Sequence, residues 1–399
     1  RILTQQRESG ICCSGSKERI NMQFRDLKKQ YQVLKKPMDE AISKVLEASN
    51  YISGSQVAEL EEKLAAYVGV KHCITCGNGT DALTLALMTW GIGEGDAVFV
   101  PDFTFFSSAE TVAYEGATPV FVDVLEDTFN MDPDSLERAV KAVLAEGKLT
   151  PKVMVVVDLF GLPADYDRLQ KIADQYGMYI LEDGAQGFGG ACKGRRVGSF
   201  GDISTTSFFP AKPLGCYGDG GAVFTDNDEW AALLKSYRIH GKGTGKYDNV
   251  RIGMNSRLDT IQAAILQVKL QAFEEYELED VNRVAAVYTE QLKDCVKVPE
   301  IPEGYLSGWA QYSILLKDKE ERDSLQAYLK EQDVPSMIYY PKGMHQQTAF
   351  AGCELYGETF KVSEDICGRV LALPLSPYLT EEDQQKVIRL IREKTGAKA

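Results

Sequence analysis

The sequence contains no apolar run of the ~18 residues that a membrane-spanning helix requires. Basic side chains are outnumbered as well, because 44 Lys and Arg face 58 Asp and Glu and leave a formal net charge of −14. Nucleic acids and anionic membrane surfaces bind to basic faces, so this charge argues against both as partners. What remains is the composition of a soluble globular protein, with 44% hydrophobic and 26% charged residues.

The first 21 residues lack the apolar centre of a secretory signal and do not begin with Met. We expect residues 1–21 to be a disordered extension or a cloning remnant, and the ordered protein to open at Met22. The nine cysteines are dispersed at irregular spacing, which is typical of reduced thiols in a cytosol. Cys73 and Cys76 form a CxxC pair, but no second pair follows at zinc spacing. We therefore expect a cytoplasmic protein without a metal site.

Strand-length apolar segments alternate with helix-length amphipathic segments up to about residue 181. This alternation predicts an α/β fold with a mainly parallel sheet that helices cover on both faces. After about Gly253 the pattern changes to one long helix, expected from Arg257 to Leu278 or beyond, and then to a smaller α/β unit. The expected strands of that unit lie near 312–316 and 336–340.

The chain length of 399 residues predicts two or three domains. We expect a large domain over residues 22–256, and a linking helix with a small C-terminal domain over residues 257–399.

One lysine stands in surroundings that are unusual for a surface lysine. Lys212 lies in the run Ser207-Phe208-Phe209-Pro210-Ala211-Lys212-Pro213-Leu214, and four glycines follow before residue 222. Apolar surroundings lower the pKa of a lysine from its reference value of about 10.4, which is the condition for a Schiff-base nucleophile. A glycine-rich turn with a stray lysine explains the same residues equally well, so the rest of the chain has to decide.

Asp183 follows the expected strand at residues 179–181, and Gly184-Ala185-Gln186 come next. Ligands of open α/β sheets bind at this edge. A carboxylate there, 29 residues before Lys212, suits a pyridoxal ring, whose pyridine nitrogen needs an anion to stay protonated. Taken alone, the residue is more typical of a loop aspartate that caps a helix.

Two further strand-to-helix loops carry candidate residues. Gly77-Asn78-Gly79-Thr80-Asp81 offers backbone N–H groups, a helix dipole and a hydroxyl to a phosphate, although ordinary βα turns have similar sequences. Pro101-Asp102-Phe103-Thr104-Phe105-Phe106 offers an aromatic ring that could stack on a flat cofactor, although core packing is the commoner use.

The segment between residues 238 and 257 reverses the charge of the chain. It contains a single acid, Asp248, and six basic or potentially basic side chains: Arg238, His240, Lys242, Lys246, Arg251 and Arg257. Such a segment suits a diphosphate or a carboxylate on the substrate, or it is a solvated loop.

Taken in order, GNGTDAL, PDFTFF, EDGAQ, SFFPAK, YGDGGA and NSRLDTIQAA resemble the aminotransferases of nucleotide-linked keto sugars, the DegT/DnrJ/EryC1/StrS group. The resemblance runs from about Gln23 to the C-terminus. It implies a transferase of fold type I that depends on pyridoxal 5'-phosphate (PLP), with a large mixed, mainly parallel sheet domain and a small C-terminal α/β domain.

The same resemblance implies roles for individual residues. Lys212 would form the Schiff base and move the proton, and Asp183 would pair with the pyridine nitrogen. Asn255 would reach the phosphate in a neighbouring subunit, which implies a homodimer with shared active sites. The other implied cofactor contacts are Gln186 near the ring hydroxyl, Phe105 stacked on the ring, and Gly79, Thr80 and Ser207 at the phosphate.

Within the group, SFFPAKPLGCYGDGGA and RIGMNSRLDTIQAAIL most resemble the aminotransferases of UDP-2-acetamido-2-deoxy-3-keto-glucuronate. Those enzymes use glutamate, which becomes 2-oxoglutarate, and supply diamino-uronic acids for bacterial O-antigen, a lipopolysaccharide component. Arg257 is our candidate for the sugar carboxylate, and His240 and Tyr339 lie in segments expected on the substrate side.

Two departures leave the sugar open. Tyr247-Asp248-Asn249 stands where a Tyr-His-His-like sequence is frequent, and Tyr339 replaces a common histidine before Tyr340-Pro341. An aminotransferase for a 4-keto-6-deoxy sugar is therefore an alternative. A sugar dehydratase of the same fold is a more remote alternative, because the dehydratases replace the lysine with histidine. A non-catalytic regulator that binds PLP is also more remote, because a regulator need not keep Lys212, Asp183 and the phosphate turn together.

Overall fold

The structure is a computed structural model that describes residues 22–245 and 247–396. The expected extension at residues 1–21 and the basic side chain of Lys246 lie outside the described residues. Within the described ranges, no helix is long and apolar enough to cross a membrane.

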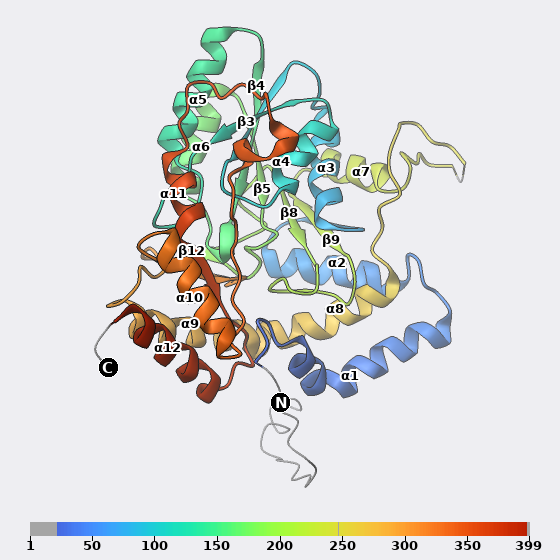
Figure 1. Ribbon diagram of the computed structural model, residues 1–399. Helices are drawn as coiled ribbons and strands as arrows, with labels where there is room; N and C mark the ends of the chain where they lie inside the picture. The colour runs from blue at the N-terminus through green and yellow to red at the C-terminus, as the bar shows by residue number, and fades with distance from the viewer. Residues whose placement is uncertain (1–21, 246, 397–399) are drawn as a thin grey trace.

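A seven-stranded sheet forms the centre of the molecule, in the order β1-β9-β8-β5-β4-β2-β3 (Figure 1). All neighbouring strands are parallel except the pairs that involve β9, which runs against both β1 and β8. The predicted mixed, mainly parallel sheet is thus confirmed. The strands are β1 (His72–Cys76), β2 (Asp96–Pro101), β3 (Thr118–Val122), β4 (Thr150–Val157), β5 (Tyr179–Asp183), β8 (Ile203–Ser207) and β9 (Gly221–Thr225).

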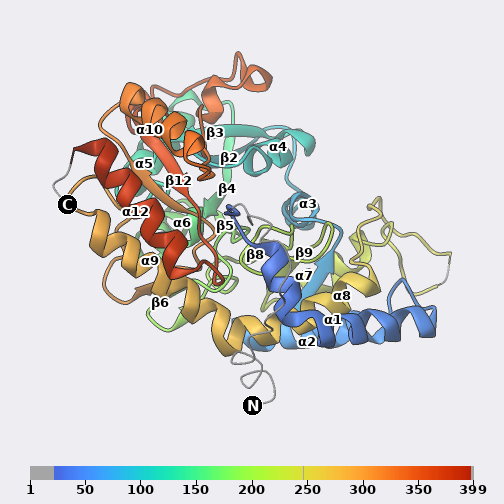
Figure 2. The ribbon, with the colours of Figure 1, turned by 60° about the horizontal axis from the view of Figure 1, so that its bottom comes forward.

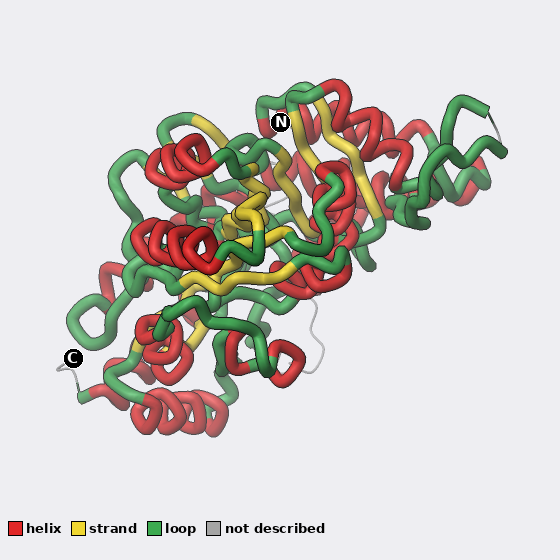
Figure 3. The backbone as a smooth tube through the Cα atoms, turned by 90° about the horizontal axis from the view of Figure 1, so that it is seen from above, coloured by secondary structure: helices red, strands yellow, loops and turns green. Residues whose placement is uncertain are grey.

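Helices cover both faces of this sheet, and its strands β2, β3 and β4 carry long apolar runs as a result. The strand β8 differs, because four of its five residues are Ser or Thr. In β4, Val153 and Val155 pack in one core while Met154 and Val156 pack in the other. The first core is closed by α3 (Gly79–Trp90), α4 (Ser107–Tyr114) and α7 (Asp228–Tyr237), and the second by α5 (Pro133–Glu146) and α6 (Tyr166–Tyr176). Figure 3, which looks from above, shows the yellow strands of the sheet with red helices on both sides of them.

A third core lies under β1 and β9, where α2 (Ser55–Val68) and α8 (Thr260–Ala272) cover the sheet. The N-terminal helix α1 (Leu27–Ala48) packs outside α8 (Figure 2). Cys73 and Cys76 are buried in β1 as part of these cores.

The long helix predicted from Arg257 begins three residues later, at Thr260. Asp259 pairs with Ile52 in an isolated antiparallel bridge, and the Thr260 amide donates to the Tyr51 carbonyl over 2.9 Å. This extended pairing is incompatible with helical backbone at residue 259. The helix then continues without a break through a π-helical turn, η3 (Phe273–Glu277), into α9 (Leu278–Leu292).

The C-terminal part packs its own core around a two-stranded antiparallel sheet of β11 (Tyr312–Leu315) and β12 (Val370–Leu373). Its helices, coloured orange to red in Figure 2, are α10 (Lys319–Glu331), α11 (Lys361–Arg369) and α12 (Glu381–Thr395). The other short elements are β6 (Ala191–Cys192), β7 (Arg195–Arg196), β10 (Tyr305–Leu306) and the 3-10 turns η2 (Leu159–Gly161), η4 (Met344–Gln346) and η5 (Thr348–Phe350). The domain boundary at residues 256/257 stays a prediction.

The strand predicted near residues 336–340 is wrong. Only Met337 forms a bridge, to Ala372 of β12, and seven residues later the Met344 amide donates to the carbonyl of Asp102, directly after β2 of the large sheet. Tyr339 and Tyr340 are therefore directed to a cavity and not to a strand partner.

Candidate active site

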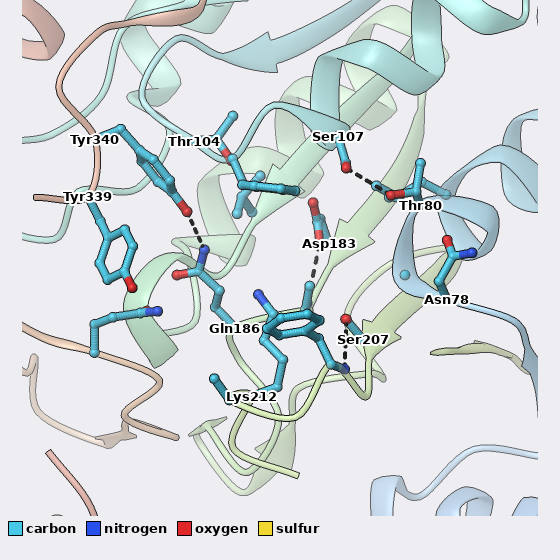
Figure 4. Close-up of a pocket in the computed structure, with 18 of the residues that line it drawn as sticks. Asn78, Thr80, Thr104, Ser107, Asp183, Gln186, Ser207, Lys212, Tyr339 and Tyr340 are labelled. Atoms are coloured by element: carbon cyan, nitrogen blue, oxygen red, sulfur yellow. Dashed lines mark hydrogen bonds between the residues drawn. The ribbon is translucent and has the colours of Figure 1, made fainter. Parts of the chain in front are cut away.

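A cavity of about 480 Å³ lies at one edge of the large sheet (Figure 4). Its lining comes from the ends of β1, β4, β5 and β8 and from the loop that follows β2. The carboxyl ends of parallel strands meet at this edge, which is where open α/β sheets bind ligands. The lining residues are Asn78, Gly79, Thr80, Leu83, Thr104, Phe105, Ser107, Val157, Asp183, Ala185, Gln186, Ser207, Phe209, Ala211, Lys212, Asp219, Gln311, Tyr339 and Tyr340.

Lys212 reaches the cavity from the loop between β8 and β9. Backbone hydrogen bonds close this loop, because the Cys216 amide donates to the Phe208 carbonyl over 2.7 Å and the Lys212 amide donates to the Phe209 carbonyl over 2.9 Å. The turn needs glycine at residue 215, where a Cβ would lie 2.5 Å from the Pro210 carbonyl oxygen. The loop is therefore a fixed support for the lysine.

The electrostatics of the site favour a neutral amine at Lys212. Burial lowers the pKa of Lys212 to about 8, although the nearby Asp183 carboxylate acts in the opposite direction. Among the described residues, no hydrogen bond is formed by this amine. A lysine with this pKa is a usable nucleophile and base close to neutral pH.

Asp183 ends β5 and is buried at the inner side of the cavity. Its Oδ2 accepts a hydrogen bond of 2.7 Å from Ser108, and its Oδ1 accepts one of 3.2 Å from the Ala185 amide. Burial raises the pKa of Asp183, whereas these two hydrogen bonds and the charge of Lys212 act to lower it. The contacts fix the carboxylate in place, where a cationic N–H of a ligand could pair with it.

The first turn of α3 forms one end of the cavity. Asn78 caps this helix, since its side chain accepts from the Asp81 amide over 2.8 Å, and Thr80 Oγ1 lies 2.8 Å from Ser107 Oγ. A Cβ on Gly79 would lie 2.7 Å from Cβ of Ser207, so only glycine allows this close approach. Backbone N–H groups at a helix N-terminus and two hydroxyls are suited to a phosphate.

Gln186 ties the cavity to the C-terminal part of the chain. Its Oε1 accepts from the Phe160 amide and its Nε2 donates to the Tyr340 hydroxyl, both over 3.0 Å. Phe105 stands at the rim with 53% of its surface exposed, and its ring centroid lies 6.4 Å from that of Tyr340. An exposed aromatic ring at this position is available to cover a flat ligand.

Eight predicted residues line this single cavity: Gly79, Thr80, Phe105, Asp183, Gln186, Ser207, Lys212 and Tyr339. The other three, His240, Asn255 and Arg257, do not line it. Asn255 forms a bridge with Ile239, its side-chain oxygen accepts from Arg257, and His240 lines a separate open hollow. These three belong to or adjoin residues 238–256, which we call the arm and which projects at the right of Figure 1.

Sequence reasoning missed several contributors. Ser107 and Ser108 follow the PDFTFF motif at the start of α4, and their position after a strand of the sheet edge was the available signal. Tyr340 and Gln311 also line the cavity, and the buried side-chain oxygen of Gln311 has no hydrogen-bond partner within the described part of the chain. Nothing in the local sequence marks Gln311, because the turn that brings it to the cavity is made by distant residues.

The residues present fit pyridoxal 5'-phosphate. Among the residues that the structure describes, the lysine amine makes no hydrogen bond, a buried carboxylate ends the neighbouring strand, and Gly79 approaches Ser207 so closely that a Cβ would lie 2.7 Å from the Ser207 Cβ. When bound, this cofactor supplies an electron sink for amino-group transfer. Fold and site together define an aminotransferase of PLP fold type I.

The comparisons with known proteins specify the family. The sequence profile of the DegT/DnrJ/EryC1/StrS aminotransferase family matches residues 32–392, and the chain belongs to this family. A crystal structure of a DegT/DnrJ/EryC1/StrS aminotransferase from Brucella abortus superposes with a TM-score of 0.92 at 52% sequence identity, over 94% of this chain and 100% of that chain.

Two curated relatives extend the comparison. The UDP-2-acetamido-2-deoxy-3-oxo-D-glucuronate aminotransferase of Pseudomonas aeruginosa is 43% identical over 361 residues, which are 90% of this chain and 96% of its own length. A pleiotropic regulatory protein of Geobacillus stearothermophilus is 40% identical over 94% of this chain and 98% of its own length. Other matched relatives are named as transaminases of dTDP-linked amino sugars. The protein is therefore a PLP-dependent nucleotide-sugar aminotransferase.

Proposed function

We propose that this enzyme transfers the amino group of glutamate to UDP-2-acetamido-2-deoxy-3-keto-glucuronate, in the cytoplasm, for the synthesis of bacterial surface polysaccharide such as O-antigen. The observation that carries the proposal is the Lys212–Asp183 cavity in a chain that is 43% identical to the Pseudomonas aeruginosa relative over nearly its whole length. The sugar would then occupy the side of the cavity that Tyr339 and Tyr340 line.

Lys212 is proposed as the catalytic proton carrier. With a pKa of about 8, roughly one lysine in ten is neutral at pH 7, compared with about one in a few thousand for an unperturbed lysine. A neutral amine can take a proton from one carbon atom and return it to another, and general acid–base transfer of this kind contributes about 10²- to 10⁴-fold to rate. Asp183 is proposed to hold the ring nitrogen of the cofactor protonated.

The remaining cofactor contacts are assigned by position. We propose that Gly79, Thr80 and Ser207 hold the phosphate, that Gln186 lies near the ring hydroxyl, and that Phe105 covers the ring. The phosphate assignment is supported by the N-terminus of α3, whose first turn lines the cavity, and by the Thr80 and Ser107 hydroxyls beside it.

We further propose a homodimer in which the arm of one subunit completes the active site of the other. The proposal is supported by the arm itself, on which Val250 is 53% exposed and Ile252 90% exposed. Apolar side chains that project in this way are typical of a contact surface. Asn255 would then reach the partner's cofactor phosphate, and Arg257 and His240 would face the carboxylate and diphosphate of the nucleotide sugar.

A 4-keto-6-deoxy nucleotide sugar is the second candidate substrate. Relatives that are named for dTDP-linked 6-deoxy amino sugars support the 6-deoxy part of this alternative, although their names place the amino group at C3. A 4-keto-6-deoxy sugar carries no carboxylate, so Arg257 would have no anionic partner on the sugar. Lys212 argues against the dehydratase alternative, and a regulator has no need of a lysine with a lowered pKa.

A panel of amino-UDP-sugars, run in reverse with 2-oxoglutarate, tests the substrate. We expect turnover of the 3-amino uronate, and an increase of about tenfold in its KM in Arg257→Gln, because a charged hydrogen bond is lost. The exposed Lys44→Gln on α1 is the matched control. Turnover of a neutral 4-amino sugar together with failure of the 3-amino uronate would overturn the choice of sugar.

A further inference from the structure

A charged cluster outside the cavity joins the two segments that form its walls. Asp102 immediately follows β2 and precedes the Phe103–Phe105 loop, and its side chain is 0% exposed. His345 lies in η4, five residues after Tyr340, with its side chain 11% exposed. Neither residue lines the cavity, so the chemistry assigned above does not use them.

The contacts between these residues are numerous and short. The Nδ1 atom of His345 lies 2.8 Å from Oδ2 of Asp102, and the His345 amide donates to Oδ1 over 2.8 Å. The Met344 amide donates to the Asp102 carbonyl over 2.7 Å. A Cβ on Gly343 would lie 2.2 Å from Oδ2 of Asp102, so the chain could not approach so closely with any other residue there.

The second ring nitrogen of His345 faces another carboxylate. Its Nε2 lies 3.2 Å from Oε1 of Glu364 on α11, and the ring stacks on Phe360 with centroids 4.6 Å apart. A neutral imidazole has one N–H and can donate to only one of two carboxylates. Carboxylates on both nitrogens therefore indicate the doubly protonated ring.

We propose that His345, bridging Asp102 and Glu364 in its doubly protonated form, is a positioning residue that holds the Tyr339–Tyr340 wall of the cavity against the loop that carries Phe105. The wall is then correctly placed for the sugar only while the bridge persists. The effect on the sugar depends on the assignment of Tyr339 to the substrate side under the proposed function, whereas the bridge itself does not.

The electrostatic surroundings give the direction of the pH dependence. The hydrogen bond to Asp102 raises the pKa of His345, burial acts to lower it, and Glu364 raises it further. Cys367 on α11 lies in the same surroundings: burial raises the pKa of its thiol, the charges of Asp102 and Glu364 raise it further, and Arg322 on α10 acts to lower it. A raised pKa in the folded state means that the bridge is fully formed below about pH 6.5 and is lost as the pH rises through the pKa of His345.

The chain contains only three histidines, His72, His240 and His345, so each can be followed separately. Hydrogen exchange at the ring C2, read by mass spectrometry of the full chain, gives the pKa of each without any substrate. We expect the pKa of His345 to lie above about 6.5. A value at or below 6.5 would show that the bridge does not exist in solution.

His345→Gln tests the wall directly. We expect amide exchange in the peptide that covers residues 339–346 to become about tenfold faster. The Met344 and His345 amides both donate to Asp102, and without the imidazole this residue is no longer held in place as their acceptor. His72→Gln is the matched control, since His72 pairs with Asp228 over 2.7 Å at an exposed edge. Unchanged exchange in His345→Gln would refute the positioning role.

The kinetic readout is the KM of whichever nucleotide sugar the enzyme turns over. In the wild type it should rise about tenfold as the pH passes the measured pKa of His345, with kcat little changed, and in His345→Gln it should be high and flat. If that variant fails to fold, Glu364→Gln removes only the outer, half-exposed carboxylate. It should move the KM transition to lower pH, and an unmoved transition would contradict the proposal.

Discussion

At the scale of the residue, the behaviour of Lys212 follows from what surrounds its amine. Desolvation disfavours the charged ammonium, while the Asp183 carboxylate favours it, and the balance leaves a pKa of about 8. The same proximity acts on Asp183, whose pKa is raised by burial and held back by Ser108 and Ala185. The pKa of each group therefore depends on the charge of the other group and on the burial that the fold imposes on both.

Lys212→Ala should retain cofactor binding but lose turnover by at least about 10³-fold, because the proton carrier is removed while the phosphate contacts remain. Equilibrium binding of PLP, followed by its absorbance, and steady-state kinetics measure the two effects. Lys44→Ala, on the exposed side of α1, serves as the control and should behave as wild type. An active Lys212→Ala enzyme would refute the assigned role.

The sequence allowed the central chemistry to be predicted but not its supports. Lys212 was singled out by its unusual neighbours and Asp183 by its place directly after an apolar strand, but the local sequence left both roles open. The order of the motifs along the chain, and the family resemblance that this order carries, decided them. Ser108 is an ordinary helix residue in sequence, and its hydrogen bond to Asp183 depends on how the start of α4 meets the end of β5. Its place after a strand of the sheet edge was a signal for the site, but nothing local connects it to a residue 75 positions away.

At the scale of the element, the N-terminus of α3 is the part of the site that we propose binds the phosphate. Gly79 is the first residue of this helix and lies against Ser207 at the end of β8. The close approach brings the free N–H groups of the helix and the Ser207 hydroxyl to the same point. An added Cβ would separate them.

Gly79→Ala should weaken PLP binding by about tenfold or more, because its Cβ would meet the Ser207 Cβ at 2.7 Å. The helix itself should not suffer, since Ala is the better helix former by about 1 kcal/mol. Gly368→Ala on α11 is the matched control, because nothing lies within 4 Å of its Cβ position. Titration of the cofactor-free protein with PLP gives the affinities, and equal affinity in both variants would exclude the phosphate role.

The elements themselves were predictable where local patterns determine them. The strands and helices up to β5 were evident because parallel strands buried on both faces are largely apolar. The strand β8 was not predicted, because its sequence Ile-Ser-Thr-Thr-Ser lacks the apolar run that marks the others. The predicted start of α8 was wrong because the bridge to Ile52 holds Asp259 in an extended conformation. The predicted strand at residues 336–340 was wrong because the contacts between Asp102 and His345 direct that segment away from the small sheet. Both errors arise from contacts between distant parts of the chain.

At the scale of the whole molecule, the cavity of one chain is lined by most of the predicted site residues. Asn255, Arg257 and His240 are the predicted residues that do not line it. These residues lie on or beside the arm, whose apolar side chains Val250 and Ile252 are exposed. A symmetric pair of subunits would use one arm in each direction, as a two-fold interface requires. The proposed dimer therefore accounts for both observations with one contact.

Mixing two inactive variants tests this arrangement. If Lys212 and Asn255 serve the same site from different subunits, a heterodimer of Lys212→Ala with Asn255→Ala contains one site in which both residues are native and one in which both are replaced. Random association makes about half of the dimers mixed, so the mixture should recover about a quarter of wild-type activity. Co-expression with two affinity tags, followed by activity measurements on the purified heterodimer, checks the value. Activity no higher than that of the separate variants would place Asn255 outside the partner's site and remove the basis for shared active sites.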